Sequence, residues 1–250
     1  FDSYKARFEK AALMASNDDI IDALITRHGK TFCSELGIQI ERNEPAPLFQ
    51  WLVASNLFST RISFEHGTKA AKDLFEEGLT TPQKMRDAKW ETRVRILNEA
   101  GYARMDEKYS TYLGEMADGL IEEYDGDLRN LRNAADRDPE EEISRLKRFE
   151  GISASGASIF CREVQAVWDE LYPFADKKAL QAADALDLGK TAEALAKHVD
   201  QEDFPRLVAA LVRVGGVRVR VRRVCHTLGY DGPGVRVSER PTGRDRTIHW

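Results

Sequence analysis

The chain has 250 residues, of which 42% are hydrophobic and 32% are charged, enough to bury one large core or two smaller ones. It contains no run of about 20 apolar residues, so we expect no membrane-spanning helix, and no signal-peptide pattern is visible. The net charge of −5 argues weakly against a nucleic-acid protein.

The charge is distributed unevenly along the chain. Residues 213–250 carry nine arginines, no lysine and three acidic residues, so the preceding part of the chain is strongly acidic. A nucleic-acid-binding face on that part must therefore be a local basic patch, because the overall charge does not supply one.

Cysteine usage limits the cofactors that the chain can hold. Cys33, Cys161 and Cys225 are far apart in the sequence and odd in number. This spacing fits neither a zinc site nor a disulfide framework, and it is typical of a reducing cytosol.

Up to about residue 214, nearly every segment has the 3.6-residue period of an amphipathic helix, which predicts an all-α body. Capping residues, prolines and glycines mark the helix ends. We expect helices over residues 4–14, 20–28, 48–58, 64–77, from 82, 90–100, 106–124, 128–134, from 139, and then 180–188, 191–198 and 203–212. The segment 48–58 is apolar nearly all round, so we expect it to be the buried central helix.

A helix–turn–helix segment follows residue 143. Ile143, Leu146 and Phe149 share one helical face, and residues 150–156 form a turn of small residues around Ile152. A second helix then carries apolar residues at helical spacing as far as Trp168. A tight turn with glycines lets a ligand approach the backbone closely, and free N–H groups at the start of a helix suit a phosphate oxygen.

This order of parts resembles the helix–hairpin–helix DNA glycosylases of the endonuclease III superfamily. Their hairpin reads roughly L-P-G-V-G-x-K-T-A, and an essential aspartate follows in a V-D-T-H-like context. Residues 149–157 here match the hairpin in pattern, and Ala175-Asp176-Lys177-Lys178 matches the aspartate stretch. The chain departs from the family at two positions: Ser153 replaces the second hairpin glycine, and Ser155 holds the place of the Schiff-base lysine.

The resemblance extends over about residues 47–190 and implies a two-lobed helical DNA glycosylase fold. We expect residues 1–214 to form the all-helical region. Residues 30–140 would form one lobe, and the termini with the hairpin region would form the other. Residues 215–250 are expected to be an irregular, Arg/Gly-rich basic tail.

The resemblance also implies roles in DNA binding. The hairpin would grip backbone phosphates through its amides, with two basic residues adding charge; the residues concerned are Lys147, Arg148, Gly151, Ile152, Ser153, Ser155 and Gly156. A loose alignment with the family's S-A-Q-x-x-D loop places Arg61 near the side chain that wedges into the base stack. The alternative for Arg61 is a surface residue in a helix–helix turn. Trp51, Phe58 and Tyr112 are candidates for lining a base pocket.

Asp176 is the candidate catalytic residue. A carboxylate in a desolvated pocket can stabilise the cation-like sugar that forms when a base leaves, or it can activate water. Asp176 also precedes a helical run, so it can serve as an N-cap. Lys177 and Lys178 could touch phosphates. With Ser155 in place of the lyase lysine, the resemblance implies a monofunctional glycosylase with weak or absent AP-lyase activity.

Three hypotheses follow: a base-excision glycosylase, a non-catalytic helix–hairpin–helix DNA-binding protein, and an unrelated helical protein. The glycosylase hypothesis implies that the partner is double-stranded DNA with a damaged or mismatched base. It also implies that the protein is a monomer and is located in the bacterial cytoplasm, at the nucleoid. No cofactor is expected, because three dispersed cysteines cannot hold the family's iron–sulfur cluster. The tail is either an out-of-frame extension of a GC-rich gene or a basic arm that adds phosphate contacts.

Overall fold

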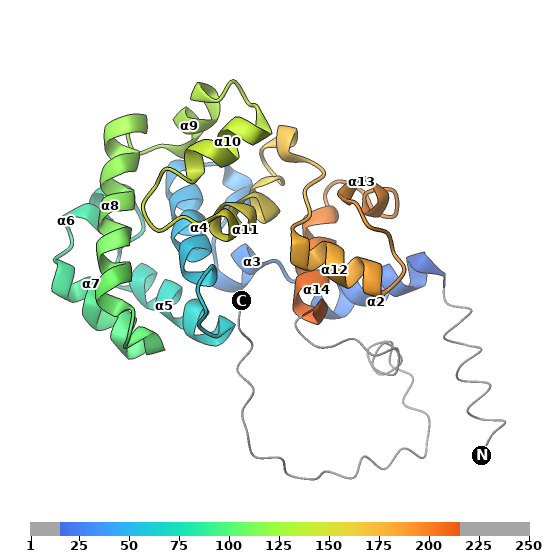
Figure 1. Cartoon of the computed structure of the whole chain (residues 1–250), viewed down its shortest axis with the longest axis horizontal. Helices are drawn as coiled ribbons and strands as arrows, with labels where there is room; N and C mark the ends of the chain where they lie inside the picture. The colour runs from blue at the N-terminus through green and yellow to red at the C-terminus, as the bar shows by residue number, and fades with distance from the viewer. Residues whose placement is uncertain (1–15, 216–250) are drawn as a thin grey trace, which may run out of the picture. The chain divides into compact units, whose positions relative to one another are not determined.

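The computed structural model describes residues 16–215. The predicted all-α class is confirmed, because this part of the chain is built of helices (Figure 1). The expected helix 4–14, Cys225 and the tail 216–250 lie outside the described residues. Among residues 16–215, no helix combines the length and the apolar character that crossing a membrane requires.

The described residues belong to two compact units. The central unit is Phe32–Phe174, and the terminal unit combines residues 16–31 with residues 175–215. The hairpin segment lies in the central unit, whereas the sequence analysis groups it with the termini. Asp176 lies in the terminal unit.

The central unit contains the longest helices of the described chain. Its elements are α3 (Phe32–Leu36), η1 (Ile40–Arg42), α4 (Pro45–Phe58), α5 (Phe64–Glu76), α6 (Pro82–Asp87), α7 (Trp90–Leu97), η2 (Asn98–Tyr102), α8 (Asp106–Tyr124), α9 (Leu128–Ala134), α10 (Pro139–Leu146), α11 (Ala154–Val164) and η3 (Asp169–Leu171). The terminal unit contains α2 (Asn17–His28), α12 (Lys177–Ala185), α13 (Ala192–Leu195) and α14 (Phe204–Gly215).

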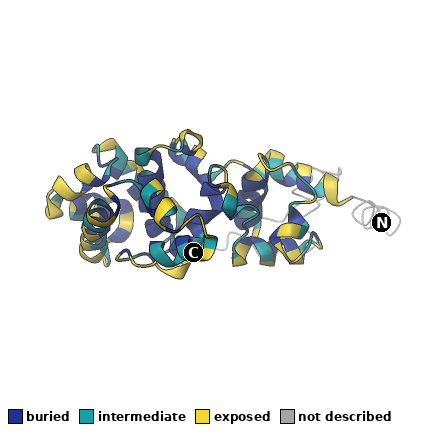
Figure 2. Ribbon diagram, turned by 90° about the horizontal axis from the view of Figure 1, so that it is seen from above, coloured by how far each residue is buried: buried dark blue, intermediate teal, exposed yellow. Residues whose placement is uncertain are grey.

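Helix α4 is the buried centre of the central unit, as its all-round apolar sequence predicts. Every residue from Trp51 to Phe58 is buried, because α5, α9 and α11 all pack against this helix (Figure 1). The indole of Trp51 donates to the carbonyl of Phe160 on α11 at 3.0 Å. Most other helices are buried on one face and exposed on the other (Figure 2).

A buried arginine fixes α8 against its neighbours. The guanidinium of Arg93 donates to the carbonyl oxygens of Met85 and Ala88 at the end of α6, both at 2.8 Å, and to that of Ser110 on α8 at 3.0 Å. The last carbonyls of a helix have no partner within it. Arg93 therefore satisfies the end of α6 and holds it to α8.

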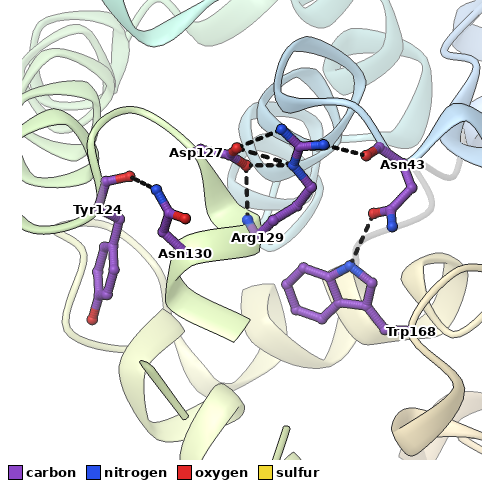
Figure 3. A network of polar contacts seen from close by, with 6 residues as sticks. All are labelled: Asn43, Tyr124, Asp127, Arg129, Asn130 and Trp168. Carbon is purple, nitrogen blue, oxygen red and sulfur yellow. Dashed lines mark hydrogen bonds and ion pairs between the residues drawn. The ribbon is translucent and has the colours of Figure 1, made fainter. Parts of the chain in front are cut away.

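A polar network joins the start of the unit to its end (Figure 3). Trp168 donates from its indole to the side-chain oxygen of Asn43 at 3.2 Å, and Arg129 donates to the carbonyl of Asn43 at 3.5 Å. Asp127 caps α9 and accepts from the Arg129 guanidinium at 2.7 Å. Asn43, after η1, is thereby fixed to α9 and to the segment after α11.

The structure corrects several expected helix limits. The second hairpin helix ends at Val164 and does not reach Trp168, which precedes η3. The expected helix 90–100 is α-helical only to Leu97 and continues as the wider π-helix η2, in which Gly101 has a φ of 102°. The short elements α3 and η1 were not expected.

The terminal unit is organised around α14. Its apolar residues are buried, and α2 and α12 pack against it. Arg213, near its end, donates to the carbonyl of Lys30 at 3.0 Å. His198 pairs with Asp18 at 3.2 Å, which links the segment after α13 to the first turn of α2.

Candidate nucleic-acid interface

The predicted helix–turn–helix segment is present. Helix α10 ends at Leu146, residues 147–153 form the turn, and α11 begins at Ala154. Gly151 has a φ of 79°, in the left-handed region that favours glycine. Ile152 is buried beneath the turn, as its place among small residues predicts.

Two side chains from other helices lie directly under Gly151. A Cβ atom at this position would come within 2.7 Å of the Tyr112 ring on α8 and within 2.8 Å of Nδ2 of Asn56 on α4. Both are closer than real Cβ contacts. Glycine is therefore needed at residue 151 for two reasons: its φ angle and the close approach of α4 and α8.

The N-terminus of helix α11 directly follows the turn. Ser153 is its N-cap and accepts from the amide of Gly156 at 3.2 Å. The substitution of the family's second hairpin glycine thus supplies a side-chain cap. Ser155 lies in the first turn of α11 and is exposed. The amides of Gly156 and Ala157 are both bonded to Ser153. The first two amides of the helix, those of Ala154 and Ser155, have no acceptor within it, so they form a potential site for an anion.

Basic side chains surround the turn. Lys147 and Arg148 are exposed just after α10, and Arg148 lies 3.6 Å from the carboxylate of Glu141. Lys108 on α8 is also exposed, and its ammonium lies 5.2 Å from the centre of the Tyr112 ring, which contacts Gly151. Three cations therefore lie in or beside the turn, which also carries the exposed Glu150.

The loop of residues 59–63 adjoins the hairpin. A Cβ atom at Gly156 would lie 3.6 Å from the side chain of Ser59, the first residue of this loop. Arg61 is exposed in the loop, between α4 and α5. Its neighbour Thr60 is buried, and Thr60 accepts from the amide of Ile62 at 3.2 Å. The structure thus places the Arg61 loop beside the first turn of α11.

Asp176 is the N-cap of α12, as its sequence context predicts. Its Oδ1 accepts from the amides of Lys178 at 3.0 Å and Ala179 at 2.9 Å. The side chain is half-buried, and Lys177 and Lys178 are exposed in the first turn of α12. The cap prediction is confirmed, and the catalytic role remains a prediction.

Both cysteines within the described residues carry thiols that burial keeps protonated. Cys33 and Cys161 are buried, and burial raises the pKa of both thiols well above its ordinary value. Residues 16–215 contain no group of three His, Cys, Asp or Glu side chains placed to hold a metal ion. The expectation that no cofactor is bound remains a prediction.

Sequence reasoning missed some residues at this surface, and the pocket roles given to three aromatic residues stay predictions. Asn56 and Lys108 were not expected beneath and beside the hairpin, because only the packing of α4 and α8 brings them there. Tyr112 was expected to line a base pocket, and its ring contacts Gly151. Trp51 and Phe58 were given the same role, but both are buried in the core of the central unit.

The chain matches no protein-family model and no curated protein sequence. Two solved structures are similar. A non-covalent Endonuclease III–DNA complex has a TM-score of 0.52 and 16% sequence identity, and covers 86% of this chain and 98% of that one. A trapped Endonuclease III–DNA covalent intermediate, the estranged-adenine complex, has a TM-score of 0.43 and 16% identity, with 65% of this chain and 71% of that one covered. The first likeness shows that this chain has the helical fold of endonuclease III.

Proposed function

We propose that this chain, given its endonuclease III-like fold, is a base-excision DNA glycosylase that acts on double-stranded DNA with a damaged or mismatched base. The observation that carries the proposal is the exposed hairpin turn. The turn depends on the positive φ of Gly151 and leads directly into the N-terminus of α11. It also carries the exposed side chains of Lys147 and Arg148. Backbone amides and cations in this arrangement suit the phosphates of a strand, and such contacts position DNA without reading its sequence.

The loop of residues 59–63 supports a second contact. It adjoins α11 through Ser59, and it carries the exposed Arg61. A strand held by the hairpin would bring its bases near this loop. We assign Arg61 the role of the wedge that fills the stack when a base is flipped out.

Asp176 is the proposed catalytic residue. The glycosidic bond breaks through a sugar that becomes positively charged, and a carboxylate stabilises this charge or activates the attacking water. The two cap bonds to Oδ1 fix the direction of the Asp176 side chain at the start of α12. Lys177 and Lys178, exposed beside it, are proposed phosphate contacts.

The proposed enzyme is monofunctional. A lyase needs an amine that attacks the sugar and forms a Schiff base. Ser155, exposed in the first turn of α11, holds the place of that amine and has only a hydroxyl. We therefore expect no borohydride-trapped adduct between the wild type and abasic DNA. Ser155→Lys is the positive control, and a good yield of adduct with the wild type would contradict this part of the proposal.

The decisive experiment uses duplex oligonucleotides that each carry a different damaged or mismatched base, followed by alkali to cleave abasic sites. The wild type should release at least one of these bases. Asp176→Asn should bind the same duplex with similar affinity, because the amide keeps the cap acceptor, while base release should fall by at least about 100-fold. Equal release by both proteins would remove Asp176 from the chemistry.

A non-catalytic DNA-binding protein is the second candidate. It is favoured by Ser155, since an exposed serine at this position leaves the hairpin able to bind a strand but removes one chemical route. Binding of every duplex without release of any base would support this candidate and contradict the glycosylase.

A further inference from the structure

The side chain of Asn56 is the least satisfied polar group beneath the hairpin. It is fully buried on α4, and among the described residues neither its Nδ2 nor its Oδ1 has a hydrogen-bond partner. An amide buried in this way lowers the stability of a protein, since it loses its bonds to water and gains none. Buried polar groups are nearly always paired, so this exception calls for an explanation.

Asn56 has no evident value for the packing of α4. Its neighbours Leu52, Val53, Leu57 and Phe58 are apolar and buried, so an apolar residue would suit the same position. Ser55, the other polar residue of this turn, differs because its hydroxyl donates to the carbonyl of Trp51 at 2.7 Å. Asn56 is therefore the one residue of this pair that retains an unmet polar group.

The position of the amide points to the hairpin. Nδ2 of Asn56 lies 2.8 Å from the place that a Cβ atom of Gly151 would occupy, so it is in direct contact with the turn. Gly151 has a φ of 79°, and glycine tolerates positive and negative φ almost equally. Glycine therefore lets the Glu150–Gly151 peptide rotate at low cost. The peptide that follows Gly151 is held in place, because the amide of Ile152 donates to the carbonyl of Phe149 at 3.1 Å.

We infer that Asn56 is a positioning residue for the hairpin, which bonds the Glu150–Gly151 peptide when a DNA phosphate binds to the turn. The inference rests on the proposed DNA-binding function. In the free protein the amide is unpaired at a cost in stability. In the complex, rotation of a peptide beside Gly151 gives it a partner and fixes the turn in its bound conformation. Asn56 thus makes the binding of a strand more favourable without touching DNA.

Two variants test the inference, Asn56→Ala and Asn56→Leu, which bracket the volume of the asparagine side chain. At least one should raise the Tm by about 2–6 °C, since an unsatisfied amide is removed. Both should bind DNA about tenfold more weakly, as expected for the loss of one hydrogen bond in the complex. The affinity is measured with a fluorescent duplex that contains a tetrahydrofuran abasic-site analogue. A purely structural residue would lower stability and affinity together.

Ser55→Ala is the matched control, because it removes a buried and satisfied hydroxyl from the same helical turn. It should lower the Tm and leave the affinity unchanged. In addition, the side-chain ¹⁵N–¹H₂ resonances of Asn56, assigned by their absence from the Asn56→Ala spectrum, should shift when the duplex is added.

Three outcomes would overturn the inference. If both Asn56 variants lower the Tm, the amide is satisfied in the free protein. If the wild type binds the duplex and both variants bind it equally well, Asn56 does not act on the hairpin, while the proposed function stands. If the wild type does not bind the duplex at all, the proposed function itself fails and the inference fails with it.

Discussion

Gly151 is the residue on which the geometry of the hairpin depends. Its φ of 79° strains any other residue, and the Tyr112 ring and the Asn56 amide leave no room for a Cβ atom. We predict that Gly151→Ala lowers the free energy of unfolding by about 2–4 kcal/mol and weakens DNA binding. Urea denaturation and fluorescence anisotropy measure the two effects.

Gly78 provides the control for this prediction. Its φ of 90° is just as unfavourable for alanine, but a Cβ atom there would meet nothing within 4 Å. Gly78→Ala should therefore cost only about 1 kcal/mol and should leave DNA binding unchanged. Equal losses for the two variants would show that strain alone, and not the contact with α4 and α8, makes glycine necessary at residue 151.

At the residue scale, the sequence predicted those features that depend on neighbouring residues, such as helix caps. The cap at Asp176 was recognisable because it bonds an amide only three residues away, as the caps at Ser16 and Asp138 also do. The burial of Asn56 follows from its place in an apolar helix, but the missing partner of its amide was not predictable, since the groups around that amide come from α8 and from the hairpin turn. Its neighbours in sequence give no sign of either.

Helix α3 is held by a carboxylate from the other end of the central unit. Glu163 on α11 is buried, and it accepts from the amides of Phe32 at 2.6 Å and Cys33 at 2.7 Å. Glu163→Gln would turn an NH₂ group toward one of these two donors. We predict that it lowers the free energy of unfolding by about 2–4 kcal/mol, measured by urea denaturation. The exposed Glu202→Gln should have almost no effect.

Helix α10 carries a buried carboxyl group that faces another. Glu142 is fully buried, and no donor among the described residues reaches its oxygens. It faces Glu170 in η3, which is paired with Arg132 of α9. The two carboxyl groups can form a hydrogen bond only when Glu142 is protonated and donates to Glu170. Burial, together with the hydrogen bond to Glu170, raises the pKa of Glu142 to about 8.

This arrangement predicts a pH dependence of stability with a definite sign. The folded pKa of Glu142 exceeds its ordinary value of 4.5, so its contribution is complete below pH 4.5 and is lost as the pH rises through 8. The free energy of unfolding should fall by up to about 1.4 kcal/mol per pH unit in this window. The other groups that act on Glu142 are Arg132, which opposes the shift, and Asp138, which adds to it.

Glu142→Gln isolates this effect, because its amide imitates the protonated acid and can donate to Glu170. Urea denaturation between pH 5 and 9 should show a shallower pH dependence for this variant than for the wild type. The same slope in both proteins would mean that Glu142 does not titrate in this range. The buried thiol of Cys161, which also senses Glu142, has a pKa too high to contribute here.

At the element scale, long helices were predictable and short ones were not. Helices α8 and α9 have the limits expected from their periodicity and their flanking turns. Helix α3 has five residues, too few to show a period, and Glu163, which caps it, lies far along the chain. The widening at η2 depends on Gly101, whose sequence signal indicated only a helix end.

On the scale of the whole molecule, DNA binding by an acidic protein must depend on a few well-placed cations. Lys147→Ala combined with Arg148→Ala removes two of them beside the hairpin. If each contacts a phosphate, the slope of log K against log salt should become shallower by about 2. Anisotropy titrations between low and moderate salt measure this slope.

The control removes the same charge elsewhere. Lys84 and Arg86 are both exposed on α6, so Lys84→Ala combined with Arg86→Ala changes the net charge equally. This double variant should keep the slope of the wild type. Identical changes in both double variants would mean that net charge, and not contact at the hairpin, governs binding.

The overall fold was predictable because the order of helices, hairpin and aspartate resembles one family. The grouping of helices into units was not. Periodicity marks which face of a helix is buried, but not which partner covers it, and the hairpin accordingly belongs with α4 and α8 in the central unit. The roles proposed for Asp176, Arg61 and Ser155 come from the resemblance, because periodicity gives helices but not the chemistry of single residues.

The division of the chain into these units also bears on how the molecule is made. The central unit is one continuous stretch, Phe32–Phe174. All of the helices that pack together in it are therefore available as soon as that stretch has left the ribosome. The unit formed by α2, α12 and α14 is discontinuous, and α2 must wait for α14, which is synthesised nearly two hundred residues later. During that interval the apolar face of α2, with Ile21 and Leu24, lacks the cover that α14 gives it in the folded protein, which exposes it to chaperones and proteases.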